Sequence, residues 1–230
     1  MIPYRRVPPG VHPPEDPAYR STVLRHPLEP LVQIPQTMSE ITGPSYPWDV
    51  VGAVDNDLTL QHASAPVGER IIVEGRVLDD SGRPLPRALV EIWQANACGR
   101  YAHEVDTHDA PLDPNFTGTG RTITDDDGCY RFVTIMPGHY PWGNHHNAWR
   151  PAHIHFSVLG PGFLTRLVTQ MYFPGDPLQP LDPIFNSVRD PEVRQRMVSS
   201  FDIGLTSPDW ALGFRWDIVL RGRDATPPLA

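Results

Sequence analysis

Short stretches in which hydrophobic and polar residues alternate run along the chain from about residue 70 onward. They are rich in β-branched and aromatic residues, and such alternation is typical of strands, whose side chains point to opposite faces in turn. Turn-forming residues such as Asp80-Ser81-Gly82 separate the stretches. The pattern predicts seven strands, over residues 70–78, 88–94, 121–124, 130–135, 153–158, 167–173 and 214–220.

One stretch, over residues 190–200, predicts a helix, with Asp190 as its N-cap and Pro191 at its first position. Seven short strands and one short helix favour an all-β fold, a β-sandwich with long loops. The chain has 28 prolines among its 230 residues. Because Pro does not fit inside long helices or central strands, this composition excludes a helix bundle.

The beginning of the chain has a different pattern. Its first 20 residues include Pro3, Pro8, Pro9, Pro13, Pro14 and Pro17. Such a segment predicts an extended arm that does not fold by itself. We therefore divide the chain into an N-terminal arm with a connecting segment, residues 1–60, and a β-sandwich domain, residues 61–230.

Composition removes several classes of function. The net charge is −8 and no basic face is evident, which argues against nucleic-acid binding. All 19 basic residues are Arg, so a Lys nucleophile is excluded. Cys98 and Cys129 form no CxxC pair, so no disulfide framework or Cys-rich zinc site is expected. With no apolar run long enough for a membrane span and no signal-peptide pattern, the sequence predicts a cytoplasmic protein.

The sharpest chemical signal is the pair His153 and His155, two residues apart in a predicted strand. Residues at this spacing point to the same face, so both imidazoles can reach one metal ion, although two histidines used for packing would share the pattern. Tyr140 lies shortly before them. Its phenolate would be a hard anionic oxygen, and a mixed His and Tyr set favours ferric iron over zinc. Tyr140 taken alone fits a core aromatic residue equally well.

Several segments together resemble the intradiol ring-cleavage dioxygenases, and in particular the β subunits of that family that act on protocatechuate. The similarity covers roughly residues 15–223, in order. The segments that carry it are 75–79, 88–96, 99–101, 110–116, 140–142, 149–156, 170–177 and 215–222.

The resemblance implies one non-haem Fe(III), held by two tyrosines and two histidines, and cleavage of a catechol by O2 to a cis,cis-muconate. Tyr140, His153 and His155 match three of the metal ligands. Counting back from the 110–114 segment puts His108 at the fourth, while Tyr101 aligns with an aromatic pocket position. If His108 binds, the site has three histidines and one tyrosine, with a higher reduction potential and a weaker tyrosinate colour. The alternative is that His108 stays in its loop and water fills the fourth position.

The resemblance also implies roles for other residues. Tyr140 would act first as a ligand and then as a base, and Arg150 would stabilise the anion that develops on the ring. Gln170 is expected to be catalytic and, with Tyr172, to hold oxygen atoms of the reacting substrate. Three further residues, Tyr19, Trp142 and Ile184, are expected to line the substrate.

A homologous α subunit is the implied partner, giving an αβ hetero-oligomer. The expected substrate is a substituted catechol resembling protocatechuate. Because the loop 102–109 departs from the usual β subunit, 4-sulfocatechol is a rival substrate. Two other readings stay open: a non-catalytic β-sandwich subunit or binding module, and, more weakly, a zinc hydrolase with Asp176 as its base.

Overall fold

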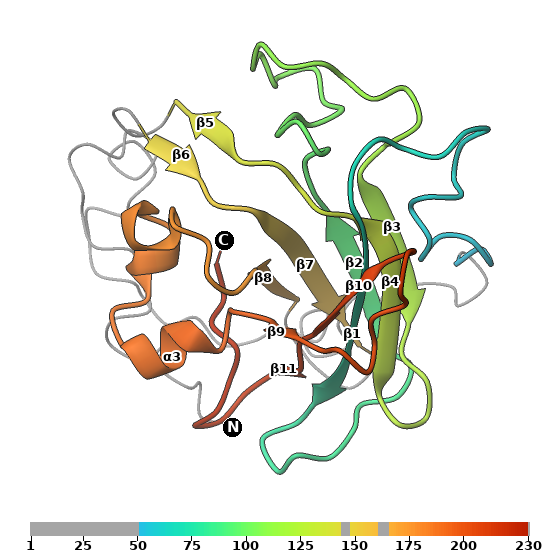
Figure 1. Ribbon diagram of the computed structural model, residues 1–230. Helices are drawn as coiled ribbons and strands as arrows, with labels where there is room; N and C mark the ends of the chain where they lie inside the picture. The colour runs from blue at the N-terminus through green and yellow to red at the C-terminus, as the bar shows by residue number, and fades with distance from the viewer. Residues whose placement is uncertain (1–50, 144–147, 161–165, 230) are drawn as a thin grey trace.

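The computed structural model describes residues 51–143, 148–160 and 166–229. The predicted arm and its Tyr19 lie outside these ranges. Two sheets and a short two-stranded ribbon make up nearly all of the regular structure, so the predicted all-β class is confirmed (Figure 1).

The first sheet is built around β1 (Arg70–Leu78). β4 (Cys129–Ile135) pairs with β1 antiparallel, whereas β10 (Leu212–Arg215) and β11 (Ile218–Val219) both pair with it parallel. The short β9 (Ser200–Phe201) extends this sheet beside β10.

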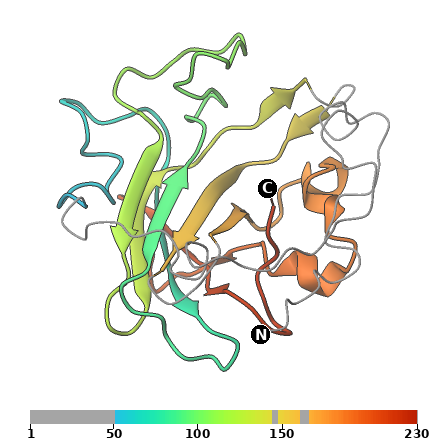
Figure 2. The ribbon, with the colours of Figure 1, turned by 180° about the vertical axis from the view of Figure 1, so that it is seen from behind.

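The second sheet is antiparallel throughout, in the order β3-β2-β7-β8. Its strands are β3 (Thr119–Ile123), β2 (Leu89–Trp93), β7 (His153–Leu159) and β8 (Leu167–Tyr172). A separate ribbon pairs β5 (Tyr140–Trp142) with β6 (Ala148–Arg150). Seen from behind, this ribbon projects beyond the end of β7, to which the chain leads directly from β6 (Figure 2).

The core lies between the two sheets, because alternate residues of each sheet point inward. Phe132 of the first sheet and Phe156 of the second are both fully buried, and their rings meet edge to face with centroids 6.3 Å apart. Leu58, also fully buried, donates its backbone N–H to Val133 O at 2.8 Å. Residues before the expected boundary at 60 thus contribute to this core, while the division into arm and domain stays a prediction.

Six of the seven predicted strands are found with shifts of only a residue or two at their ends. The seventh, 214–220, is instead two strands, β10 and β11, that share one parallel register against β1. The ladder is interrupted opposite Gly75, where an added Cβ would lie 1.7 Å from the carbonyl oxygen of Trp216. At the next position Asp217 Oδ1 accepts the N–H of Arg76 at 2.8 Å, so a side chain replaces the backbone partner.

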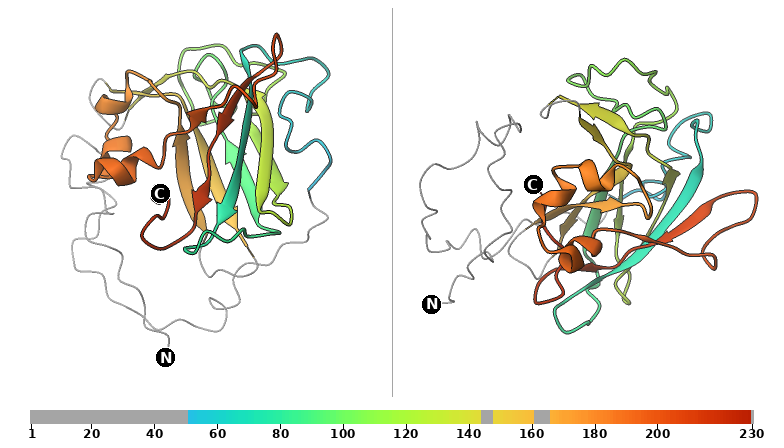
Figure 3. Two further views of the ribbon diagram at one scale, coloured as in Figure 1. Left: turned by 60° about the horizontal axis from the view of Figure 1, so that its bottom comes forward. Right: turned by 60° about the vertical axis from the view of Figure 1, so that its left-hand side comes forward.

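The predicted helix is shorter than expected: α3 covers only Pro191–Gln195, with the Asp190 side chain capping its first turn. The chain then turns back to β8, since Met197 O accepts the N–H of Tyr172 at 2.8 Å and Ser199 N–H donates to Tyr172 O at 2.8 Å. Two 3₁₀ turns precede it, η2 (Gln179–Leu181) and η3 (Phe185–Ser187). This helical segment lies to one side of the sheets in both views of Figure 3. No helix in the described part of the chain is long and apolar enough to cross a membrane.

Candidate active site

The two predicted histidines lie side by side on the outer face of the second sheet. Their strand neighbours Ile154 and Phe156 point into the core, so the pleat turns His153 and His155 the other way. The two rings are 4.9 Å apart between centroids. Trp93, paired with His155 across β2 and β7, stacks on its ring at 4.7 Å with the planes within 5°. The strand geometry therefore brings both imidazoles together and fixes one of them by stacking.

Both imidazoles are held in the neutral form that a metal ligand needs. His153 Nδ1 lies 2.7 Å from the carbonyl oxygen of Pro151, so Nδ1 carries the proton and Nε2 keeps its lone pair. Burial, assisted by the positive charge of Arg150, holds the pKa of His153 well below its ordinary value. The same two causes lower the pKa of His155 to about 3. Both side chains are thus available as neutral nitrogen donors at physiological pH.

Two tyrosines complete this group. Tyr140, at the start of β5, directs its Oη to 3.3 Å from His153 Nε2. The ring of Tyr101, in the loop after β2, meets that of Tyr140 edge to face at 5.4 Å and lies 6.3 Å from the ring of His155. Burial raises the pKa of both phenols.

The hydroxyl of Tyr101 is buried and makes no hydrogen bond of ordinary geometry with a described residue, although the Tyr140 phenol is close enough to add to the effect of burial and raise its pKa further. An unpaired buried hydroxyl is costly, and such groups in native structures call for an explanation. A cation beside it would supply one, because it favours the phenolate and reverses the effect of burial on the pKa. Tyr101, Tyr140, His153 and His155 together form a donor set of two phenolic oxygens and two imidazole nitrogens, which suits a hard trivalent metal.

Close backbone contact holds the two tyrosine-bearing segments together. Gly99 has a φ of +76°, and an added Cβ there would lie 1.9 Å from the carbonyl oxygen of His139, the residue before Tyr140. Gly138 donates its N–H to Asn96 O at 2.9 Å, and an added Cβ would lie 2.4 Å from Ala97 O. Only glycine fits at these positions, so the chain itself places Tyr101 next to Tyr140.

The structure does not bring His108 into the site. Its ring packs edge-on against Trp149, with centroids 5.9 Å apart. Asp106 shapes this loop by accepting the N–H of Tyr101 at 2.8 Å and that of His108 at 2.9 Å. In the part of the chain that the structure describes, no three His, Cys, Asp or Glu side chains are grouped so that they could hold a metal ion. No group that joins His108 to His153 and His155 is therefore found, and the expected site of three histidines and one tyrosine stays a prediction.

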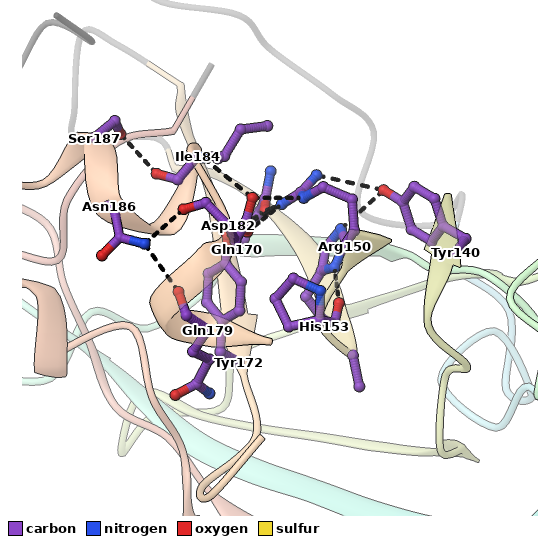
Figure 4. Close-up of polar contacts among 12 residues, drawn as sticks. Tyr140, Arg150, His153, Gln170, Tyr172, Gln179, Asp182, Ile184, Asn186 and Ser187 are labelled. Carbon is purple, nitrogen blue, oxygen red and sulfur yellow. Dashed lines mark hydrogen bonds and ion pairs between the residues drawn. The ribbon is translucent and has the colours of Figure 1, made fainter. Parts of the chain in front are cut away.

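Arg150, at the end of β6, is the charged centre beside these donors (Figure 4). It is 2% exposed, and its Nη1 lies 3.4 Å from Tyr140 Oη. Burial opposes its charge, but the neighbouring Tyr172 and Asp182 outweigh this effect and raise the pKa of Arg150. It is therefore a permanent buried cation beside Tyr140, and its role toward a substrate stays a prediction.

Gln170 and Tyr172, predicted to hold substrate oxygens, both face Arg150. Gln170 Oε1 accepts from Arg150 Nη2 at 2.6 Å and from the Tyr172 hydroxyl at 2.8 Å. Because the guanidinium can only donate, this contact orients the Gln170 amide, with its oxygen toward Arg150 and its –NH₂ group on the other side. The Tyr172 hydroxyl is occupied within the network, since it also accepts from Arg150 Nη2 at 3.1 Å.

Of the two predicted wall residues, Trp142 contacts Arg150 and Ile184 contacts its partner Asp182. The Trp142 ring covers the Arg150 guanidinium at 5.4 Å, a cation–π contact. Ile184 follows Asp182 and donates its N–H to that carboxylate at 3.1 Å. Asp182, which the sequence reasoning missed, is the buried partner of Arg150, and the short sequence Leu181-Asp182-Pro183 contains no pattern that marks it.

A separate open hollow of about 490 Å³ lies on the outer face of β2 and β3. Trp93, which stacks on His155, lines this hollow, but none of the four donor residues does.

Asp176, considered above as the base of a zinc hydrolase, already contacts other groups of the chain. Its Oδ2 lies 2.8 Å from His139 Nε2 and accepts the N–H of Ala152 at 2.9 Å.

Comparison with known proteins points to the same family as the sequence resemblance. A family model described as "Dioxygenase" matches residues 41–222, and one described as "Protocatechuate 3,4-dioxygenase beta subunit N terminal" matches residues 4–37. The chain is 55% identical to the protocatechuate 3,4-dioxygenase beta chain of Burkholderia cepacia over 92% of this chain and 90% of that one. It is 36% identical to catechol 1,2-dioxygenase of Candida albicans over 59% of this chain and 46% of the relative.

A solved structure agrees with these sequence matches. The crystal structure of 3-chlorocatechol 1,2-dioxygenase from Rhodococcus opacus 1CP aligns with a TM-score of 0.55 and 25% identity. The alignment covers 78% of this chain and 70% of that one.

Proposed function

Because the chain belongs to the intradiol ring-cleavage dioxygenases, we propose that it is the β subunit of an enzyme that cleaves a substituted catechol between its two hydroxyl groups. The co-substrate would be O2 and the product a cis,cis-muconate. The observation that carries the proposal is the convergence of Tyr101, Tyr140, His153 and His155 around the unpaired Tyr101 hydroxyl.

Fe(III) is the metal that we propose for these four residues. Two phenolate oxygens balance part of its charge, and two neutral imidazoles complete the protein ligands. When bound, ferric iron would draw electron density from the catechol ring and make it reactive toward O2. With Tyr101 in place of His108, the strong colour of two tyrosinates is expected.

The residues of the chain itself have separate tasks in this proposal. A catechol loses two protons as it binds, and Tyr140 Oη is the candidate acceptor for one of them. The charge of Arg150, whose Nη1 lies 3.4 Å from that oxygen, supports the phenolate and any anion that develops on the ring. The –NH₂ group of Gln170, on the side of the amide away from Arg150, would provide a donor for a substrate oxygen.

Support for protocatechuate as the substrate comes from the 55% identical beta chain. The rival 4-sulfocatechol rests on the departure of the 102–109 loop, in which His108 packs on Trp149. Both substrates carry an anionic substituent, so charge does not distinguish them. Comparing the turnover of the two substrates does.

An α-type partner is proposed because the matched relative is a beta chain and because residues 4–37 match a beta-subunit segment. We also propose a cytoplasmic location.

Iron analysis and visible spectroscopy test the proposal. The full chain, produced alone and with an α-type partner, is examined before and after anaerobic addition of protocatechuate, and O2 uptake is then measured. Bound iron, a broad tyrosinate band that shifts with substrate, and O2 uptake are expected. A colourless assembly without iron and without O2 uptake would contradict the proposal and favour the binding-module reading.

A further inference from the structure

Asp182 belongs to none of the groups that would touch iron or substrate, yet it is completely buried beside Arg150. We propose that Asp182 is a positioning residue, which fixes the Arg150 guanidinium so that its Nη1 group faces Tyr140 and the substrate. The inference rests on the proposed function and adds to it a residue that acts through another.

Two parallel contacts join the side chains. Asp182 Oδ1 accepts from Arg150 Nε at 3.0 Å, and Oδ2 accepts from Nη2 at 3.1 Å. A two-point pair of this kind fixes the plane of the guanidinium as well as its distance, which a single contact does not. Both side chains are almost inaccessible, 3% for Arg150 and 0% for Asp182, so solvent does not compete for these contacts.

The carboxylate is itself firmly held. Oδ1 accepts the N–H of Ile184 at 3.1 Å, and Oδ2 lies 3.2 Å from the Tyr172 hydroxyl, whose one proton is shared with Gln170 Oε1. The backbone carbonyl of Asp182 accepts from the Asn186 side chain at 2.8 Å and from the Asn186 N–H at 3.0 Å (Figure 4). The η2–η3 segment therefore presents the carboxylate in one orientation, and Arg150 must match it.

The remaining edge of the guanidinium is the one that matters for chemistry. Nη2 is shared among Gln170, Tyr172 and Asp182, and the contact found for Nη1 is Tyr140 Oη at 3.4 Å. Because the guanidinium is planar, fixing Nε and Nη2 also fixes the direction of Nη1. A displacement of about 1 Å at a positioned group can cost roughly 100-fold in rate.

Charge gives a second reason for a carboxylate here. Removing one partner of a buried ion pair leaves the other charge uncompensated. Without Asp182, the guanidinium would be an unpaired buried cation beside a site that we propose for a metal ion. Nε would also lose the acceptor found for it, and Nη2 would keep only the neutral Gln170 and Tyr172, so the guanidinium could turn and move Nη1 away from Tyr140.

The test compares kinetics per bound iron in the assembled enzyme for the wild type, D182N, R150Q and the double variant. D182N is expected to lower kcat roughly 10- to 100-fold while KM changes less than about threefold, with iron content and the visible band retained. In the R150Q background, D182N is expected to add no further loss, because its effect passes through Arg150. A merely structural role would lower stability and add its effect in both backgrounds.

Two further variants sharpen the result. D182E keeps the charge but moves the carboxylate by one methylene group, so it should also lose kcat, and it serves if D182N does not fold. D202N removes another carboxylate paired with an arginine, Asp202 with Arg215 at 2.8 Å on the β9–β10 hairpin, and should leave kcat unchanged. Wild-type kcat in D182N or D182E would overturn the positioning role.

Failure of the proposed function can be told apart from failure of this inference, because the wild-type enzyme itself would then lack iron or turnover. In that case a crystal structure of D182N still decides the inference. An Nη1 group that keeps its contact with Tyr140 in D182N would overturn it.

Discussion

Gly99 lies so close to His139 that an added Cβ would be 1.9 Å from the His139 carbonyl oxygen. This contact joins the loop that carries Tyr101 to the strand that carries Tyr140. The proposed metal site therefore depends on a backbone contact between residues that do not touch the metal themselves.

Gly99→Ala is expected to lose bound iron and most of its activity, because the two loops must separate to admit the methyl group. Gly82→Ala is a matched control, since Gly82 has the same φ of +76° but nothing within 4 Å of an added Cβ. Both variants meet the cost of a left-handed residue, about 1–2 kcal/mol of folding free energy. Thermal unfolding and iron analysis of the pair separate the clash from the backbone cost. Equal iron content in the two variants would refute the role of the contact.

Tyr101→Phe tests the donor set. In the metal-free protein it removes an unpaired buried hydroxyl, so the free energy of unfolding should stay the same or rise. With iron, the same variant should lose a ligand and weaken the tyrosinate band, and kcat/KM should fall by roughly 100-fold or more, the upper end of the loss seen for residues behind a ligand. Metal-free and iron-loaded samples are compared by thermal unfolding and visible spectroscopy.

His108→Gln is the companion variant of Tyr101→Phe. Iron content, colour and turnover should stay near the wild-type values, because His108 packs on Trp149 rather than on the donors. Loss of iron in His108→Gln, with iron retained in Tyr101→Phe, would restore the set of three histidines.

Asp176→Asn is expected to weaken iron binding roughly 10- to 100-fold, as is usual for groups that orient metal ligands. Asp176 Oδ2 contacts His139 and the N–H of Ala152, the residues just before Tyr140 and His153. The other oxygen, Oδ1, accepts the N–H of Leu178 at 2.9 Å, so the –NH₂ group of an amide must face either this N–H or the donors at Oδ2. Metal competition with a chelator measures the change, and His139→Ala, which removes only one of the two contacts, should lose less. Unchanged iron affinity in Asp176→Asn would show that the ligands orient themselves.

Asp55 gives a prediction for acid stability. Its hydrogen bond with Arg121, at 2.7 Å, holds the pKa of Asp55 below its ordinary value of 3.8. A carboxyl with a lowered folded-state pKa stabilises the protein above its unfolded-state pKa and loses this contribution as the pH falls through the folded-state value. Asp55→Asn should therefore be less stable than wild type at neutral pH, and the difference should shrink as the pH falls below 3.8 and vanish below the lowered folded-state pKa. Denaturant unfolding across this pH range, at low salt, is the measurement; a difference independent of pH would contradict the assignment.

The strands were predictable because alternation of side chains is a local property that each segment carries. Residues 70–78 and β1 agree to the residue, for example. The interruption opposite Gly75 was not predictable, since it depends on Trp216 and Asp217, which pair with β1 from the far end of the chain. The shortened helix has the same origin, because Met197 and Ser199 leave the helix to bond with Tyr172.

The site shows the same division. His153 and His155 follow from the two-residue period of a strand, and Tyr140 from its neighbouring motif. Choosing between Tyr101 and His108 required knowing which part of a long loop faces inward. The contact of Gly99 with His139 between separate segments, and the contacts of Asp106 within the loop, support the choice of Tyr101 that we propose. The sequence signal for Tyr101 was Gly99, two residues before it, because a glycine can mark a close contact between two backbone segments.

The parallel pairing of β1 also has a consequence for biosynthesis. Glu74 and Arg215 are register partners although 141 residues separate them. One edge of β1 can pair with β4, but the other edge stays uncovered until β10 and β11 are synthesised, near the end of the domain. Such long-range pairing slows folding and leaves an open strand edge exposed meanwhile. Nascent chains of this protein are thus expected to need protection from aggregation until β10 and β11 have emerged.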